Sequence, residues 1–419
     1  MKECGNYLWL KIAYIICMTL AFMDKTQFFP WYMKYAMMVA VIGLGFLMLL
    51  YTGNFRHVAY LFEAVFILNL AYIAMIIFSI LLWIQEFQTM TFISRGCSTI
   101  LYLMLGVGCV ISSVYMFREK AVEYTFIAMA LGNTVILFQA AVNQGIGTIF
   151  QDLSVFIRSG FVETPPFIRA LEIHDLTFGI TFYCLYYLIC IRKHKRNVIY
   201  FGIAFFFTIL GVKRIALAAV GVILVIYVLM KLLSENSALR IAKIIWIPAV
   251  LICYFYVYSV HGTLLDHVVE YFNIDMMGRQ EMYDYFRSYY QFSPAYVGKG
   301  IGYITRTIEQ LTEADVGIFG EHYFGSMHND ILLYYIELGF VGFFCWIWYH
   351  FRTRILWIWK SGGKEAGLIM LYAVIYLFIT YTTDNTSVYS FVQITCTLLP
   401  LAEAVNYRDK LEGGERLEL

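Results

Sequence analysis

Apolar residues form long runs along almost the whole chain, and short polar stretches separate them. A run of about 20 apolar residues is long enough to cross the hydrocarbon core of a bilayer, about 30 Å thick, as a helix. The pattern predicts twelve such spans, at residues 7–23, 31–51, 58–84, 97–117, 121–141, 175–191, 197–211, 215–231, 244–260, 329–350, 366–383 and 387–405. The sequence therefore predicts an all-α, polytopic membrane protein in which residues 1–419 form a single transmembrane domain.

Composition agrees with this prediction. Hydrophobic residues make up 61% of the chain and charged residues only 14%, whereas soluble domains carry about 25% charged residues. The first apolar run follows Met1 and Lys2 without a small-residue cleavage site, so we expect a retained span rather than a signal peptide. The net charge of +1 gives no indication of a nucleic-acid partner.

Lysine and arginine indicate the orientation, because they are enriched in cytoplasmic segments. With the N-terminus inside, the cytoplasmic segments hold Arg56, Arg118, Lys120, Arg192, Lys193, Lys195, Arg196, Lys231, Arg240, Lys243, Arg352, Arg354, Lys360, Lys364, Arg408, Lys410 and Arg416. The short external turns hold only Lys25, Lys34, Arg95, Lys213 and Arg214. This bias predicts two cytoplasmic termini and two long external segments, residues 143–174 and, between the ninth and tenth spans, residues 261–328.

The second external segment carries most of the unusual polar chemistry. Residues 261–290 have helical spacing of apolar positions, Gly298 to Gly302 break the pattern, and Thr305 to Leu311 favour another short helix. We therefore expect a helical external segment with the candidate site in it.

Lys213 and Arg214 lie between two apolar runs. They fit a plain turn whose side chains extend to the interface. However, the orientation rule disfavours two cations in a short external turn, and ionisable residues at the edge of a membrane core tend to be functional. The functional interpretation is favoured for this pair.

Three further cations follow in the large external segment. Arg279 and Arg287 are two turns apart, on roughly one side of a predicted helix, which also fits an amphipathic helix on the membrane surface. Lys299 lies within the stretch GKGIG. No strand precedes that stretch, so its likeness to a phosphate-binding loop is weak.

His328 and Asn329 end this segment, where the tenth span begins. Asn329, or Ser326, can cap the following helix, but a cap does not explain the histidine, whose imidazole suits proton transfer near neutral pH. Glu337 lies nine residues further, about 13 Å deeper, and a structural partner is favoured over a catalytic role. The sequence contains no CxxC or HExxH motif, so no metal site and no cofactor are expected.

These motifs together resemble the O-antigen polymerase and ligase superfamily, of Wzy type and WaaL type. The resemblance rests on KRIAL opening a span, GR before an aromatic-rich helix, the GxG stretch and MHNDILLYYIELGFVGF, over about residues 211–343. Lys213 stands where that family more often has Ser. The resemblance implies a helical fold of the C-type glycosyltransferase kind and metal-independent transfer of a glycan from undecaprenyl diphosphate on the external face.

Carried onto this sequence, the resemblance assigns roles to the candidate residues. His328 and Arg279 would be catalytic. Those expected to bind the diphosphate or substrate are Arg214, Lys213, Arg287 and Lys299, and those expected to support the site are Asn329 and Glu337.

We expect a polymerase of lipid-linked repeat units in a bacterial cytoplasmic (inner) membrane, with its site on the external face. Its expected partners are the undecaprenyl-diphosphate-linked oligosaccharide, membrane lipid, a chain-length regulator and a flippase. A ligase that moves the glycan to a lipid core or another acceptor is the main alternative. A flippase or other transporter is a further one, but transporters more often show internal symmetry and broken helices in both halves.

Overall fold

The computed structural model describes residues 7–23, 30, 32–53, 55, 57–85, 90–160, 163, 165–171, 173–211, 213–273, 276, 279–311 and 327–412, apart from the side chains of 90–95 and 146. Within these ranges the chain is helical and contains no strand. The prediction of an all-α fold is therefore confirmed for this part of the chain.

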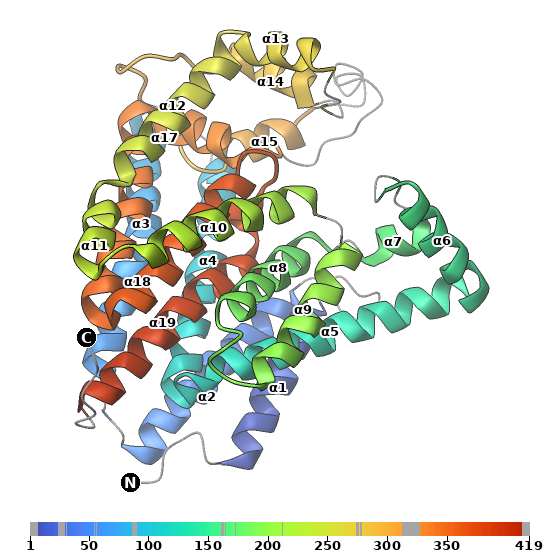
Figure 1. Cartoon of the computed structure of the whole chain (residues 1–419). Coiled ribbons are helices and arrows are strands. Elements are labelled where there is room, and N and C mark those ends of the chain that lie inside the picture. The colour runs from blue at the N-terminus through green and yellow to red at the C-terminus, as the bar shows by residue number, and fades with distance from the viewer. Residues whose placement is uncertain are drawn as a thin grey trace.

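The helices follow one another as long rods joined by short turns (Figure 1). In chain order they are α1 (Leu8–Phe22), α2 (Met33–Thr52), α3 (Val58–Gln85), α4 (Met90–Phe117), α5 (Lys120–Gln144), α6 (Ile146–Arg158), α7 (Pro166–Leu171), α8 (His174–Ile189), α9 (Arg196–Gly211), α10 (Arg214–Leu232), α11 (Glu235–Ile244), α12 (Trp246–His261), α13 (Leu264–Tyr271), α14 (Arg279–Arg287), α15 (Tyr303–Glu309), α17 (Asp330–Trp348), the π-helix η3 (Tyr349–Arg354), α18 (Ile355–Thr380), the 3₁₀ helix η4 (Thr386–Val388) and α19 (Ser390–Glu412).

Each of the twelve predicted spans falls on one of these helices. In the described residues, seven helical stretches are long and apolar enough to cross a membrane, and α1 and α9 are shorter apolar helices. The chain is thus a polytopic membrane protein, while the number of twelve spans stays a prediction.

The region of the tenth and eleventh spans differs from the sequence prediction. α17, η3 and α18 are continuous, and Gly339 and Gly363 interrupt them with φ values of 69° and 71°. Arg354, predicted in a polar cytoplasmic segment, is instead buried, and its guanidinium donates to the Thr397 hydroxyl at 3.1 Å. Besides Thr397 on α19, His350 on η3 lies beside this cation, with its Nδ1 3.2 Å from the guanidinium.

Both long segments that are predicted to be external contain helices. Residues 143–174 form α6 and α7, which the sequence analysis does not predict, and Asp152 accepts a hydrogen bond from the backbone of Phe167 at 2.9 Å. In the second segment α13, α14 and α15 agree with the predicted helical spacing, and the break at 298–302 is confirmed. Residues 312–326, which include Ser326, lie outside the described residues.

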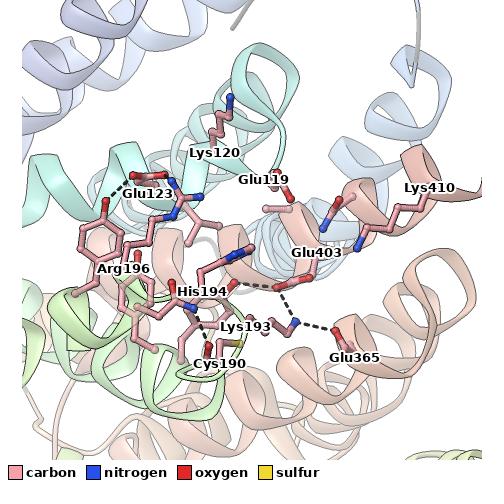
Figure 2. Close-up of a pocket in the computed structure, with 17 residues that line it drawn as sticks. Glu119, Lys120, Glu123, Cys190, Lys193, His194, Arg196, Glu365, Glu403 and Lys410 are labelled. Carbon is pink, nitrogen blue, oxygen red and sulfur yellow. Dashed lines mark hydrogen bonds and ion pairs between the residues drawn. The ribbon is translucent and has the colours of Figure 1, made fainter. Parts of the chain in front are cut away.

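The two ends of the bundle differ in character (Figure 1). α13, α14 and α15 cover one end, and the marked N and C ends of the chain lie toward the other. At the end away from α13 to α15, Lys193 contacts Glu365 at 2.7 Å and Glu403 at 3.5 Å beside a polar cavity of about 590 Å³ (Figure 2). These ion pairs join the turn between α8 and α9 to α18 and α19.

Candidate active site

Asp384, in the turn between α18 and α19, is surrounded by side chains from distant parts of the chain. Nδ1 of His328 lies 3.7 Å from one carboxylate oxygen, and the Tyr389 hydroxyl donates to that oxygen at 3.1 Å. Nδ1 of His174 and Nζ of Lys213 lie 3.7 Å and 3.8 Å from the other oxygen. We call these five residues the Asp384 cluster.

The cluster forms because several helices begin at this point. His174 is the first residue of α8, Lys213 precedes α10, His328 lies two residues before α17, and α19 begins at Ser390. The first turn of a helix leaves backbone N–H groups unpaired and carries a partial positive charge. The convergence of four such ends therefore makes this region favourable for anions.

Two buried carboxylates hold the turn that carries Asp384. Asp175 accepts hydrogen bonds from the backbone of Phe391 at 2.8 Å and of Val392 at 3.1 Å. Asp330 accepts one from the backbone of Ser387 at 2.7 Å. These carboxylates follow His174 and His328 closely in the chain, so each histidine is fixed relative to Asp384 by its own helix.

The surroundings of Asp384 keep its carboxyl ionised. Burial alone would raise its pKa, but His174, His328 and Lys213 together hold the pKa of Asp384 well below its usual range. A permanent anion at this point can orient an imidazole and stabilise its protonated form. This is the relationship that a histidine needs in order to act as a general base.

His328 has an uncommon backbone conformation. Its φ is +48°, in the left-handed region that side chains other than glycine rarely adopt, and its side chain is 27% exposed. The helix cap is supplied separately by Asn329, whose side-chain oxygen accepts from the backbone of Leu332 at 3.0 Å. The strained histidine is therefore free of the capping role, and its ring reaches solvent.

Arg279 lies one helical turn before Tyr283 in α14. The Asn329 amide donates to the Tyr256 hydroxyl at 2.7 Å. Burial raises the pKa of Tyr283, whereas a hydrogen bond to Asn329 and the charge of Arg279 lower it. Arg279, half-buried at the start of α14, thus lies on the same helix as a phenol that bonds to Asn329.

The remaining candidate cations have different surroundings. Arg287 forms an ion pair with Asp266 at 3.0 Å, which ties α14 to α13, and another with Asp284 within α14 at 2.7 Å, while its predicted contact with the diphosphate stays a prediction. Arg214 is exposed in the first turn of α10, next to Lys213. Of these two arginines, Arg214 is the one whose position suits a ligand.

The glycine stretch packs against α17. The backbone N–H groups of Lys299 and Gly300 donate to the Glu337 carbonyl at 3.2 Å and 2.8 Å. The Glu337 side chain accepts from the backbone of Ile304 at 3.1 Å, at the start of α15. Since these N–H groups are used inside the protein, the loop is a packing surface, and Glu337 holds it in place.

Sequence reasoning missed Asp384, His174 and Tyr389. A signal was present, because Asp384 and Asn385 lie in the turn between the last two predicted spans and His174 ends the first long external segment. The predicted topology places both on the same side as His328. However, the predicted spans do not define how the helices pack. They therefore do not show which polar residues on that side contact one another.

The fold and the cluster define a polytopic helical membrane protein with a polar, histidine-containing site at one end of its bundle. The O-antigen ligase family model matches residues 199–347, which include Lys213, Arg279 and His328. This match is consistent with the O-antigen polymerase and ligase superfamily and confirms the predicted resemblance. The chain has no significant match among curated proteins.

The family match supports an O-antigen-related, glycosyl-transferring function at a membrane. His174 and Asp384 lie outside the matched residues. Within the residues that the structure describes, no three His, Cys, Asp or Glu side chains form a group suited to a metal ion.

Proposed function

We propose that the protein polymerises undecaprenyl-diphosphate-linked oligosaccharide repeat units into a surface polysaccharide, an O-antigen or a capsule. The reaction would take place on the external face of the bacterial cytoplasmic membrane. The observation that supports this most directly is the position of His328, which combines a 3.7 Å contact to the Asp384 carboxylate with partial exposure of its ring. The family match over residues 199–347 supports the same class of reaction.

The proposed reaction is a glycosyl transfer with lipid diphosphate as leaving group. A hydroxyl group of the acceptor glycan attacks the anomeric carbon of the donor, and the bond from that carbon to the diphosphate oxygen breaks. Nε2 of His328 takes the hydroxyl proton, and Asp384 stabilises the resulting imidazolium. General-base catalysis of this kind contributes about 10²- to 10⁴-fold in rate.

The leaving diphosphate must be neutralised as it departs. Arg214, exposed at the start of α10, directly follows Lys213 of the cluster, and Arg279 is the first residue of α14. Guanidinium forks bind phosphate oxygens in a bidentate manner. Fixed cations placed where charge develops can do this without a metal ion, so we expect the reaction to persist in excess EDTA.

An apolar cavity offers a place for the polyprenyl chain. It has a volume of about 520 Å³, lies between α3 and α17, and is lined by Met75, Phe78, Val341 and Trp346 among others. Pro294 to Val297 form part of its wall, directly before Lys299. A lipid chain in this cavity would enter from the bilayer beside the segment that precedes α15.

A ligase is the second candidate, because the matching family is described as O-antigen ligase. The donor, the leaving group and the roles of His328 and Asp384 would be the same. The acceptor alone would differ, being a lipid core or another molecule instead of a second lipid-linked repeat unit. A polymerase would also work with a flippase and a chain-length regulator as partners.

Purified protein supplied only with undecaprenyl-diphosphate repeat units tests the proposal. A polymerase should produce a ladder of longer lipid-linked products, whereas a ligase should give no product until a separate acceptor is added. His328→Asn should insert normally and give no ladder, because asparagine cannot take up the proton. A fully active His328→Asn protein would contradict the assigned base.

A further inference from the structure

Two histidines face the same carboxylate, but their neighbours differ. Nδ1 of His174 lies 2.9 Å from Nζ of Lys213, within hydrogen-bond distance and closer than the 3.7 Å that separates it from Asp384. A lysine ammonium group can only donate hydrogen bonds, so Nδ1 of His174 must be the acceptor and carries no proton. The single proton of this neutral imidazole is then on Nε2, which is a hydrogen-bond donor.

His328 has the opposite arrangement. Its Nδ1 faces an oxygen of Asp384 at 3.7 Å, and an ionised carboxylate can only accept hydrogen bonds. This favours a proton on Nδ1 and leaves Nε2 as the acceptor. Lys213 thus holds His174 in one tautomer, and Asp384 holds His328 in the opposite one. Nε2 of His328 is suited to accept a proton, and Nε2 of His174 is suited to donate a hydrogen bond.

Exposure separates the cluster into two layers. The side chains of His174 and His328 are 45% and 27% exposed. Those of Lys213 and Asp384 are 11% and 7% exposed and lie beneath them. A ligand that reaches the cluster from outside would therefore meet the two imidazoles first, and the buried ion pair would set their tautomers.

We propose that His174 is a second catalytic residue, whose Nε2–H donates a hydrogen bond to a diphosphate oxygen of the leaving group. This proposal rests on the proposed glycosyl transfer. His174 keeps its proton throughout, while the proton of the acceptor hydroxyl passes to His328 and the electron pair of the broken bond stays on the diphosphate. Lys213 is the positioning residue, because its ammonium group holds Nδ1 of His174 as an acceptor.

The diphosphate is the group that this donor suits. An N–H donor above a lysine, near the starts of several helices, favours an anionic oxygen over a neutral hydroxyl group. The acceptor hydroxyl needs a base, which the tautomer of His328 provides.

The tautomers can be measured without any substrate. The full-length protein, labelled with ¹⁵N-histidine, contains eight histidines, and the signals of interest are assigned by their loss in His174→Gln and His328→Asn. We expect Nδ1 to be unprotonated in His174 and protonated in His328. In Lys213→Met, Nδ1 of His174 should no longer be held as an acceptor. A proton on Nδ1 of His174 in the unaltered protein would overturn the inference and leave the proposed function standing.

Activity provides the second measurement, with the ladder assay as readout. A glutamine side chain carries N–H groups near the position of Nε2, so His174→Gln should keep most of the activity. His174→Ala should lose about 10²-fold, as expected for removal of a donor to developing charge, in protein whose melting curve shows that it is folded. Full activity of His174→Ala beside an inactive His328→Asn would refute the role of His174 alone. Activity of His328→Asn would instead refute the proposed base.

Discussion

Asp384 is the residue on which the geometry of the site depends, since it touches both histidines and Lys213. Asp384→Asn keeps the shape of the side chain but removes the charge that stabilises a protonated His328. We expect activity in the ladder assay to fall by about 10²-fold. Asp409→Asn is a matched control, because Asp409 contacts His57 at 2.8 Å and Arg118 at 3.2 Å, remote from the cluster, and it should remain active.

The same substitution should affect stability in a pH-dependent way. A carboxyl group whose folded-state pKa is lowered stabilises the fold above its unfolded pKa of about 3.9, and this contribution is lost as the pH falls toward the folded value. The melting temperature of Asp384→Asn should therefore lie below that of the unaltered protein at pH 7, and the gap should narrow in acid. A gap that widens in acid would contradict the assigned charge state.

Arginine and lysine should not be interchangeable at the leaving group. Arg214→Lys and Arg279→Lys keep the charge but lose the bidentate fork, so both should lose most activity. Lys299→Arg should be milder, because the hydrogen bonds that Lys299 makes to α17 come from its backbone. Reaction rates of these variants and of the unaltered protein, each measured with and without EDTA, test the need for the guanidinium fork and the independence from a metal ion. An active Arg→Lys variant, or inactivation by chelation, would count against it.

At the scale of the elements, the glycine stretch contacts α17. The sequence shows the two sides of this contact as separate motifs and does not predict that they meet. A Cβ atom on Gly339 would lie 2.1 Å from the carbonyl carbon of Val297, and one on Gly298 would lie 2.5 Å from the backbone nitrogen of Gly339. Both glycines also have positive φ. The GxG motif at residues 298–300 and the ExG sequence at residues 337–339 are therefore the two sides of one backbone contact. This contact requires that both Gly298 and Gly339 lack a side chain.

Gly339→Ala and Gly298→Ala should each separate this contact and lower the melting temperature. Gly221→Ala is the matched control, since nothing lies within 4 Å of the added Cβ inside α10. Alanine there should be neutral or stabilise the helix by about 0.5–1 kcal/mol. Thermal unfolding monitored by size-exclusion chromatography distinguishes the variants. Equal behaviour of Gly339→Ala and Gly221→Ala would show that the close contact is unimportant.

The sequence predicts some elements well for a physical reason. Apolar runs report directly on burial in lipid, so each predicted span coincides with a helix. α6, α7 and α11 were not predicted, because short helices outside the spans have a weaker apolar signal. Similarly, His328 and Arg279 belong to local motifs, whereas Asp384 and His174 join the site only because α8, α17 and α19 begin side by side. That convergence is a property of tertiary packing.

For the whole molecule, the orientation in the membrane can be tested directly. In a variant without native cysteines, a cysteine introduced at Ser288, exposed just after α14, should react with an impermeant thiol reagent in intact cells. A cysteine at Lys195, exposed at the other end of the bundle, should not react until the membrane is opened. Labelling of Lys195→Cys alone would invert the topology and place the Asp384 cluster on the cytoplasmic side.

The position of Asp384 near the end of the chain has a consequence for biogenesis. Chains emerge from the ribosome N-terminus first, so His174, Lys213 and His328 are made before the carboxylate that joins them. Until α18 and α19 are inserted, the histidines have no common partner, and the turn that Asp175 and Asp330 hold does not exist. A nascent or prematurely terminated chain would therefore occupy the membrane as an inactive protein, and synthesis of the last two helices would complete the site.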